Sequence, residues 1–225
     1  MPRIARAVIP ECPHHVTQRG SNRIDIYLDR RDREFFIECL RKWSGQTETQ
    51  VLAYCLMTNH FHLLLSPATA DGLGRCLHGV TFRYAQYFNW RHGRCGRLWQ
   101  NRYFSCPIDR GSQLWTVARY IERNPLRAGF VRRVEDWPWS SAGAHIRGTR
   151  DPALSEPSWL TRDEVEQYRH YLTETGTEDE VRMATKTGRP LGPACFIRRL
   201  EAHLERTLAA RPVGRPRETD TQGNK

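Results

Sequence analysis

Two apolar segments separated by only two polar residues constrain the fold of this chain more than any other feature. Residues 51–57 and 60–66 are both rich in apolar side chains, and only Thr58 and Asn59 lie between them. So short a connection joins antiparallel neighbours, because parallel strands need a long crossover. The chain is therefore predicted to contain a β-hairpin, with His60 and His62 at the start of its second strand.

The segment before the hairpin predicts one strand and one helix. Residues 14–19 have the composition of a strand, which the turn cluster at residues 20–22 ends. Asp29 or Asp32 can cap the helix that follows, and Gly45 is expected to end it. The hairpin therefore follows a β-α unit.

The segment after the hairpin predicts a second helix, a strand and a third helix. Apolar residues recur at helical spacing over residues 73–90, and residues 102–108 have the pattern of a strand. A further helix begins near Gly111 and is expected to stop at Asn124, because Pro125 follows it. The order β-α-β-β-α-β predicts an α+β protein with a ferredoxin-like split antiparallel sheet and an extra helix. We expect helices on one face, with the other face, or a groove at its margin, left for a ligand and the last helix.

The composition changes after the main domain, which we place at residues 1–147. Residues 148–157 resemble a linker, residues 158–210 a small helical module, and residues 211–225 a basic tail. Thr161 with Glu164 and Thr177 with Glu180 are potential capping boxes, and a third helix is expected near Pro193. The module is either a DNA-binding helix-turn-helix or an accessory unit that packs on the main domain.

The charge of the chain indicates a polyanionic partner. There are 35 Lys and Arg residues against 25 Asp and Glu, which gives a formal net charge of +10, and most of the basic residues are arginine. The seven cysteines contain no Cys-x-x-Cys pair, which argues against a zinc ribbon or a disulfide framework. No apolar stretch approaches the length of a membrane span, and the start of the chain lacks an apolar signal core. We therefore expect a cytoplasmic, nucleoid-associated protein with no membrane contact and no small-molecule substrate.

His60 and His62 are candidate metal ligands. Residues two apart in a strand share a face and lie roughly 6.6 Å apart, so the two imidazoles could hold one divalent ion and leave positions open. On the later helix, Tyr120 and Asn124 are one turn apart and share a face. Tyrosine is a poor nucleophile while protonated, so a neighbouring metal would assist its attack on phosphorus. Tyr120 is the candidate nucleophile, and Asn124 is the candidate third ligand.

An arginine-rich stretch is the candidate nucleic-acid surface. From Gly72 to Ile108 there are six arginines, several aromatic residues and no acidic residue. Such a stretch can contact phosphates and stack unpaired bases, although part of it must belong to the core. Arg19, next to the turn at Gly20, is a further candidate by position. The candidates within the stretch are Arg83, Arg94, Arg97, Trp99, Arg102 and Tyr103.

Several of these features together resemble one family. They are the run 57–62, Tyr120 with 124–125 downstream, and the run 136–140, which reads Asp-Trp-Pro-Trp-Ser. This set is similar to the HUH single-tyrosine transposases and, more narrowly, to the REP-associated tyrosine transposases, over about residues 1 to 145. The resemblance implies that residues 1–147 form a catalytic domain.

The resemblance implies a reaction and a substrate. His60, His62 and Asn124 would hold a divalent metal, Mg²⁺ or Mn²⁺, and Tyr120 would attack a phosphodiester of single-stranded DNA. The products would be a 5′-phosphotyrosyl link and a free 3′-hydroxyl, so that a second strand can reverse the step and complete a transposase-like strand transfer. The implied partner is single-stranded or hairpin DNA with a short flanking tetranucleotide, bound by a monomer or a homodimer.

Two other functions remain open at this stage. A domesticated protein could bind hairpin DNA and regulate without cutting it. A His-x-His metallohydrolase would need acidic ligands nearby, but Asp71 and Asp109 are isolated in the sequence.

Overall fold

The computed structural model describes residues 7–156, 158–174 and 179–208. Its centre is a four-stranded antiparallel sheet in the order β2-β3-β1-β4, so β3 lies between the two strands that the first helix connects. This arrangement is the ferredoxin-like split sheet, and the predicted fold class is confirmed. The strands are β1 (His14–Arg19), β2 (Thr49–Leu56), β3 (His60–Pro67) and β4 (Phe104–Pro107).

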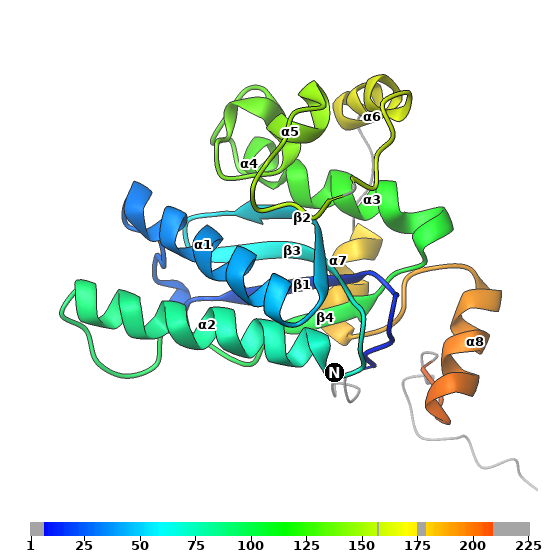
Figure 1. Ribbon diagram of the computed structural model, residues 1–225, viewed down its shortest axis with the longest axis horizontal. Coiled ribbons are helices and arrows are strands. Elements are labelled where there is room, and N and C mark those ends of the chain that lie inside the picture. Colours follow the sequence, from blue (N-terminus) through cyan, green and yellow to red (C-terminus); the bar gives the residue numbers. More distant parts are fainter. Residues whose placement is uncertain (1–6, 157, 175–178, 209–225) are drawn as a thin grey trace, which may run out of the picture.

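Two long helices, α1 (Arg30–Gln46) and α2 (Gly72–Arg91), lie side by side across one face of the sheet (Figure 1). Asp29 caps α1, because its carboxylate accepts a hydrogen bond from the backbone N–H of Asp32 at 3.1 Å. Apolar side chains on alternate strand positions face these helices and form the first core. Fully buried residues of this core include Val16, Phe36, Leu40, Phe61, Leu63 and Tyr84.

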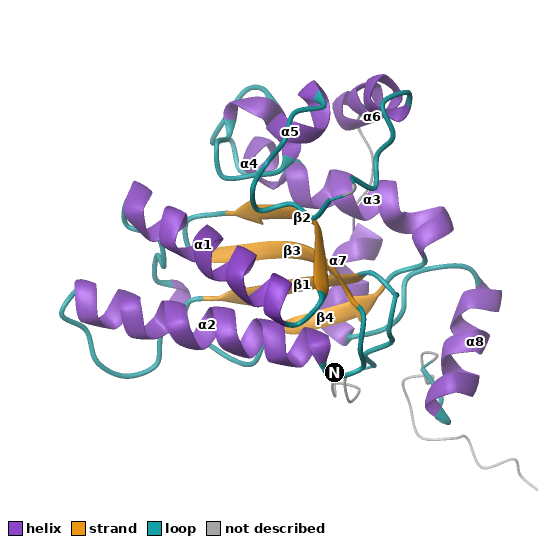
Figure 2. Cartoon of the chain, in the orientation of Figure 1, coloured by secondary structure: helices purple, strands orange, loops and turns teal. Residues whose placement is uncertain are grey.

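Two other helices cover the opposite face. Helix α3 (Arg110–Glu122) packs on β2 and β3, and α7 (Asp179–Thr187) packs on β4 and β1. Figure 2 shows helices both in front of the sheet and behind it. The expectation that this face holds only a ligand and one helix was wrong. Val181 and Ala184 of α7 are buried in the same core as α3, so the second helix completes the cover of the sheet.

Short helices continue the chain after α3. Helix α3 ends at Glu122, two residues before the expected stop, and α4 (Asn124–Arg127) begins at once. A new helix can start there because proline fits the first turn of a helix, where its missing N–H removes no hydrogen bond. The short elements near the ends of β1 and α3 are η1 (Ser21–Arg23), η2 (Val134–Asp136) and α5 (Ala142–Arg147).

The C-terminal helices begin where the sequence predicts. The carboxylate of Glu164 accepts hydrogen bonds from the N–H and the hydroxyl of Thr161, and α6 (Glu164–Thr173) follows. Helix α8 (Ala194–Leu204) starts after Pro193 and packs against the segment before β1. Thr177, of the second potential capping box, and the tail at residues 211–225 lie outside the described residues.

Helices α6 and α7 share a core with the sheet. Tyr168 and Leu172 of α6 are fully buried in the same cluster as Val117 and Ile121 of α3. The proposed boundaries at residues 148–157 and 158–210 stay a prediction. All seven cysteines fall within the described ranges and are free thiols. None of the helices in those ranges is long and apolar enough to span a membrane.

Candidate active site

His60 and His62 lie on the face of β3 that α3 and α7 cover. Phe61 between them is fully buried on the other face, in the core beneath α1 and α2. The two imidazole rings have centroids 5.0 Å apart and meet at 76°. His60 and His62 therefore share one face of β3, as the alternation of side chains along a strand predicted.

Each imidazole has one nitrogen engaged by a neighbour. His60 Nδ1 lies 2.7 Å from Asn59 Oδ1, and His62 Nδ1 lies 3.0 Å from His15 Nε2. Both Nδ1 atoms therefore have hydrogen-bond partners, and both Nε2 atoms are left to bind a metal. Metal-bound histidines in proteins usually have this arrangement, in which a neighbour fixes the ring through its second nitrogen.

Burial keeps the two imidazoles neutral. It lowers the pKa of His60 to about 4, with a smaller contribution from the positive charge of Arg19. Burial likewise holds the pKa of His62 well below its ordinary value, and the neighbouring imidazole of His60 adds to the effect. Neutral imidazole is the form that binds a metal, so the pair fits a divalent ion. Within the described ranges, no group of three or more His, Cys, Asp or Glu side chains is arranged to hold one.

Helix α3 brings Tyr120 to the histidines. Val117, Ala118 and Ile121 are fully buried and seat the helix on the sheet. The Tyr120 ring then meets the His62 ring edge-on, with centroids 5.5 Å apart and an angle of 86°. Only 5% of Tyr120 is exposed. The residues predicted to be nucleophile and metal ligand are thus neighbours in space.

Asn124 stands one turn after Tyr120, at the start of α4. Its amide nitrogen donates hydrogen bonds to the carbonyl oxygens of Tyr120 at 2.7 Å and Ile121 at 3.3 Å. These bonds hold the Asn124 side chain against the last turn of α3. They use the nitrogen of the amide, so the oxygen Oδ1, which is the atom a metal would bind, takes no part in them.

Two further residues at the site were missed in the sequence. His15 is fully buried, stacks on His62 with centroids 5.2 Å apart, and meets the edge of Tyr120 at 5.4 Å. Arg127 of α4 is exposed and places its guanidinium 5.4 Å from the centroid of the Tyr120 ring. The strand period could have assigned His15 to a face, but the register of β1 against β3 was needed to bring it to His62. For Arg127, the only signal was its position two turns of helix after Tyr120.

A sequence profile of the family described as "Transposase IS200 like" matches residues 9–124. The match covers more than half of the chain and includes His60, His62, Tyr120 and Asn124. The chain belongs to the IS200-like transposase family. The family resemblance found in the sequence is therefore confirmed.

Two comparisons place this IS200-like transposase among known proteins. It is 26% identical over 142 residues to a Haemophilus influenzae protein that is provisionally named a REP-associated tyrosine transposase; the match spans 56% of this chain and 81% of the relative. A solved structure of a REP-associated tyrosine transposase bound to a REP hairpin superposes with a TM-score of 0.56 and 20% identity, over 72% of this chain and 96% of that one. At this identity the structural likeness shows the fold alone.

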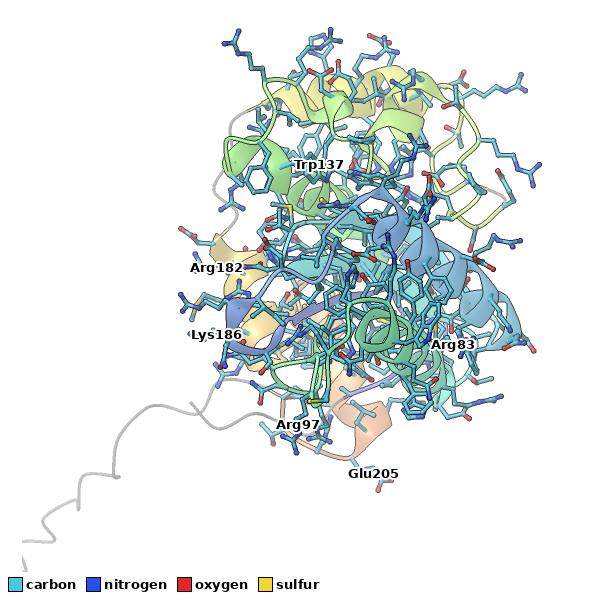
Figure 3. All side chains as sticks on the ribbon, turned by 90° about the vertical axis from the view of Figure 1, so that its left-hand side faces the viewer. Arg83, Arg97, Trp137, Arg182, Lys186 and Glu205 are labelled. Atoms are coloured by element: carbon cyan, nitrogen blue, oxygen red, sulfur yellow. The ribbon has the colours of Figure 1, made fainter. Side chains whose placement is uncertain are left out.

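The predicted DNA-contacting residues of the transposase fall into separate places. Arg19 is exposed at the end of β1 and pairs in register with His60, so it lies beside the candidate site. Arg94, Arg97 and Arg102 are exposed on the loop after α2. Arg83 is on α2, across the sheet from His60. Figure 3 shows Arg83 on the opposite side of the molecule from Arg182 and Lys186 of α7.

Trp99 and Tyr103 are less available than the loop arginines. The indole N–H of Trp99 donates to the carbonyl oxygen of Thr81 at 2.9 Å, and the ring packs edge-on against Phe61. Trp99 therefore belongs partly to the core. Tyr103 is half-buried at the wall of a groove.

That groove, of about 680 Å³, lies between α2 and the loop after it. His78 and Phe82 stack on its helical side, with ring centroids 5.6 Å apart, and 56% of Phe82 is exposed. The loop side contributes Arg97, Arg102 and Tyr103. The groove thus combines cationic and aromatic side chains, the two components of single-strand binding surfaces.

The loop connects the groove to the candidate site. The backbone N–H of Gln100 donates to the carbonyl oxygen of Arg19 at 2.9 Å, and that of Ser21 donates to the carbonyl oxygen of Leu98 at 2.7 Å. These bonds attach the loop to the end of β1, where Arg19 lies opposite His60. The loop that lines the groove therefore also reaches the end of β1 beside His60.

Proposed function

We propose that this chain is a REP-associated tyrosine transposase that cleaves and rejoins single-stranded hairpin DNA. Tyr120 is the nucleophile, and His60, His62 and Asn124 hold a divalent metal, Mg²⁺ or Mn²⁺. The observation that carries the proposal is the placement of the Tyr120 ring against His62, whose Nε2 atom is left to face a metal. Membership of the IS200-like family and the names of the two relatives support it.

In the proposed reaction, Tyr120 replaces the 3′-oxygen of the DNA at one phosphorus atom. The phenolic oxygen forms a bond to phosphorus, the bond from phosphorus to the 3′-oxygen breaks, and the phenolic proton is transferred overall to the departing 3′-oxygen. When bound, the metal supplies Lewis-acid polarisation of the phosphate. The products keep the number of P–O bonds, so the 3′-hydroxyl of another strand can reverse the step without ATP.

The arginines near Tyr120 position the phosphate. The Arg127 guanidinium already lies beside the Tyr120 ring, and Arg19 lies beside His60. A guanidinium fork matches two phosphate oxygens and stabilises the charge that develops during attack. The exposed Arg97 and Arg102 bind the strand farther from the reacting bond, in the groove that Phe82 and Tyr103 line.

One observation favours a second function. Only 5% of Tyr120 is exposed, and Arg127 lies over its ring. A protein that still bound hairpin DNA but no longer cleaved it could have a Tyr120 that is covered in this way. Under the leading proposal, Arg127 moves to the phosphate when DNA binds and opens the path to Tyr120.

Incubation with labelled hairpin DNA and Mg²⁺ or Mn²⁺, followed by a denaturing gel, tests the proposal. We expect strand cleavage by the wild type and none by His62→Ala, whose hairpin affinity should remain because the arginines provide it. His170→Ala, an exposed histidine on α6, is the matched control and should cleave normally. Binding without cleavage by the wild type, on every hairpin tried, would favour the regulatory function.

A further inference from the structure

His15, the buried histidine of β1, joins the candidate metal site to helix α7. His15 Nε2 lies 3.0 Å from His62 Nδ1, and His15 Nδ1 lies 2.6 Å from Thr185 Oγ1. The hydroxyl of Thr185 in turn donates to the carbonyl oxygen of Val181 at 2.8 Å. His15, His62 and Thr185 are each at least 95% buried, so water does not compete for these bonds.

The carbonyl of Val181, the last acceptor in this series of hydrogen bonds, determines where the protons lie. The carbonyl of Val181 can only accept, so the single hydroxyl hydrogen of Thr185 is committed to it. Thr185 Oγ1 must therefore accept from His15, which places the His15 proton on Nδ1. His15 Nε2 is then a bare acceptor, and His62 must carry its own proton on Nδ1.

The remaining neighbours agree with this assignment. Cys106 Sγ lies 3.3 Å from Thr185 Oγ1, and burial raises the pKa of the Cys106 thiol to about 12, so the thiol is protonated and can donate to the second lone pair of the hydroxyl. Every donor and acceptor in the network then has a partner.

We propose that Thr185 and His15 are positioning residues, which hold His62 in the Nδ1–H tautomer with Nε2 directed at the metal. This inference rests on the proposed function for the identity of the site. It makes helix α7 part of the active site, although Thr185 is 170 residues from His15 in the sequence. His60 reaches the same tautomer locally, because its Nδ1 donates to Asn59 Oδ1 and the Asn59 amide nitrogen donates to the Arg23 carbonyl.

The tautomer can be measured without metal or DNA. In nitrogen-detected NMR spectra of the metal-free protein, we expect His15 and His62 both to carry their proton on Nδ1. A proton on Nε2 of His62 would overturn the proposal, whatever the enzyme does. In Thr185→Val, which removes the hydroxyl but keeps the shape, His15 loses its acceptor, and we expect the single Nδ1–H form of His62 to be lost.

Metal affinity gives a second readout. Removal of a hydrogen-bond partner of a metal-bound histidine typically weakens binding by about 10- to 100-fold. Thr185 acts on His62 only through His15, so we expect the Mn²⁺ dissociation constant, measured by electron paramagnetic resonance, to rise by about 10-fold, the lower end of this range, in Thr185→Val. It should return to the wild-type value in Thr185→Ser. The same affinity in Thr185→Val as in the wild type would contradict the proposal.

Thr187→Val is the matched control for this experiment. Thr187 lies on the same helix, and its hydroxyl makes the same kind of bond to the carbonyl of Met183 at 2.8 Å, but it does not contact His15. We expect it to leave the tautomer and the Mn²⁺ affinity unchanged. An equal loss in both variants would mean that the hydroxyl acts only through the stability of α7. A failure of the wild type to bind Mn²⁺ would count against the proposed function, while the NMR measurement still decides the tautomer.

Discussion

The ring of Tyr120 meets the ring of His62 edge-on, with centroids 5.5 Å apart. One residue comes from a helix and the other from a strand, so their contact depends on how α3 is held against the sheet. Buried apolar residues seat α3, and a buried carboxylate near its end connects it to the helices that follow. Changes to these contacts should therefore act on the site through stability.

Glu122 is the buried carboxylate, and its removal should destabilise the protein. It is fully buried and accepts hydrogen bonds from Ser141 Oγ at 2.5 Å, His145 Nδ1 at 2.6 Å and Tyr168 Oη at 2.9 Å. Glu122→Ala leaves the buried donors of His145 and Tyr168 without their acceptor, so we expect the free energy of unfolding in urea to fall by about 3 kcal/mol or more. Glu166→Ala removes an exposed ion pair to Arg169 and should change the free energy of unfolding by less than about 1 kcal/mol. Equal effects would show that the buried network contributes little.

Helices α1 and α2, on the face of the sheet opposite the candidate site, allow a test of packing with two glycine substitutions. A Cβ atom at Gly79 of α2 would lie 2.0 Å from Trp43 Cδ2 of α1, whereas nothing lies within 4 Å of one at Gly74. We expect Gly79→Ala to lower the unfolding free energy by about 1 to 3 kcal/mol, because the indole must move. Gly74→Ala should raise it by up to about 1 kcal/mol through helix propensity. Urea titrations giving the same sign for both would contradict the close contact.

Much of this fold follows from local patterns in the sequence. The strand at residues 14–19, the cap at Asp29 and the hairpin turn at Thr58 and Asn59 depend on neighbours in sequence, and the structure has all of them. The pairing of His60 with His62 needed only the strand period.

The rest of the site depended on long-range packing. The register that brings His15 to His62 is set by contacts across two strands, and a short amphipathic helix such as α7 could have packed on many surfaces. The break between α3 and α4 was also misjudged, because Pro125 ends one helix and fits the first turn of the next. Trp99, expected to stack on DNA, is partly a core residue because its indole N–H satisfies the Thr81 carbonyl.

Buried His14 predicts that stability depends on pH. Burial lowers the pKa of His14 to about 4, although its ring nitrogens lie 2.7 Å and 3.1 Å from the carbonyl oxygens of Cys12 and Ala7, which favour the charged form. In the unfolded chain the pKa returns to about 6.5, so the unfolded state binds more protons between these two values. The contribution of His14 to stability is complete above pH 6.5 and is lost as the pH falls toward 4.

Urea titrations of the wild type and of His14→Gln across this pH range test the effect. We expect the stability of the variant to decline less steeply on acidification, by up to about 1.4 kcal/mol per pH unit for the one proton. A steeper decline in the variant would show that the two carbonyls dominate and hold the ring charged.

Arg127 should affect the reaction more than the binding of DNA. If its guanidinium contacts the reacting phosphate, Arg127→Ala should slow cleavage of bound hairpin by at least about 10-fold in single-turnover assays. Hairpin affinity should change little, because the groove arginines remain. Arg132→Ala, a nearby exposed arginine, is the control. A loss confined to affinity would place Arg127 among the general phosphate contacts.

The identity of the residue that becomes joined to DNA tests the central claim most directly. Hairpin DNA incubated with the protein and Mn²⁺ can be digested together with the protein, and the peptide that carries the nucleotide identified by mass spectrometry. We predict a 5′-phosphate linked to Tyr120, and no adduct in Tyr120→Phe. An adduct on another residue, or one that persists in Tyr120→Phe, would contradict the account.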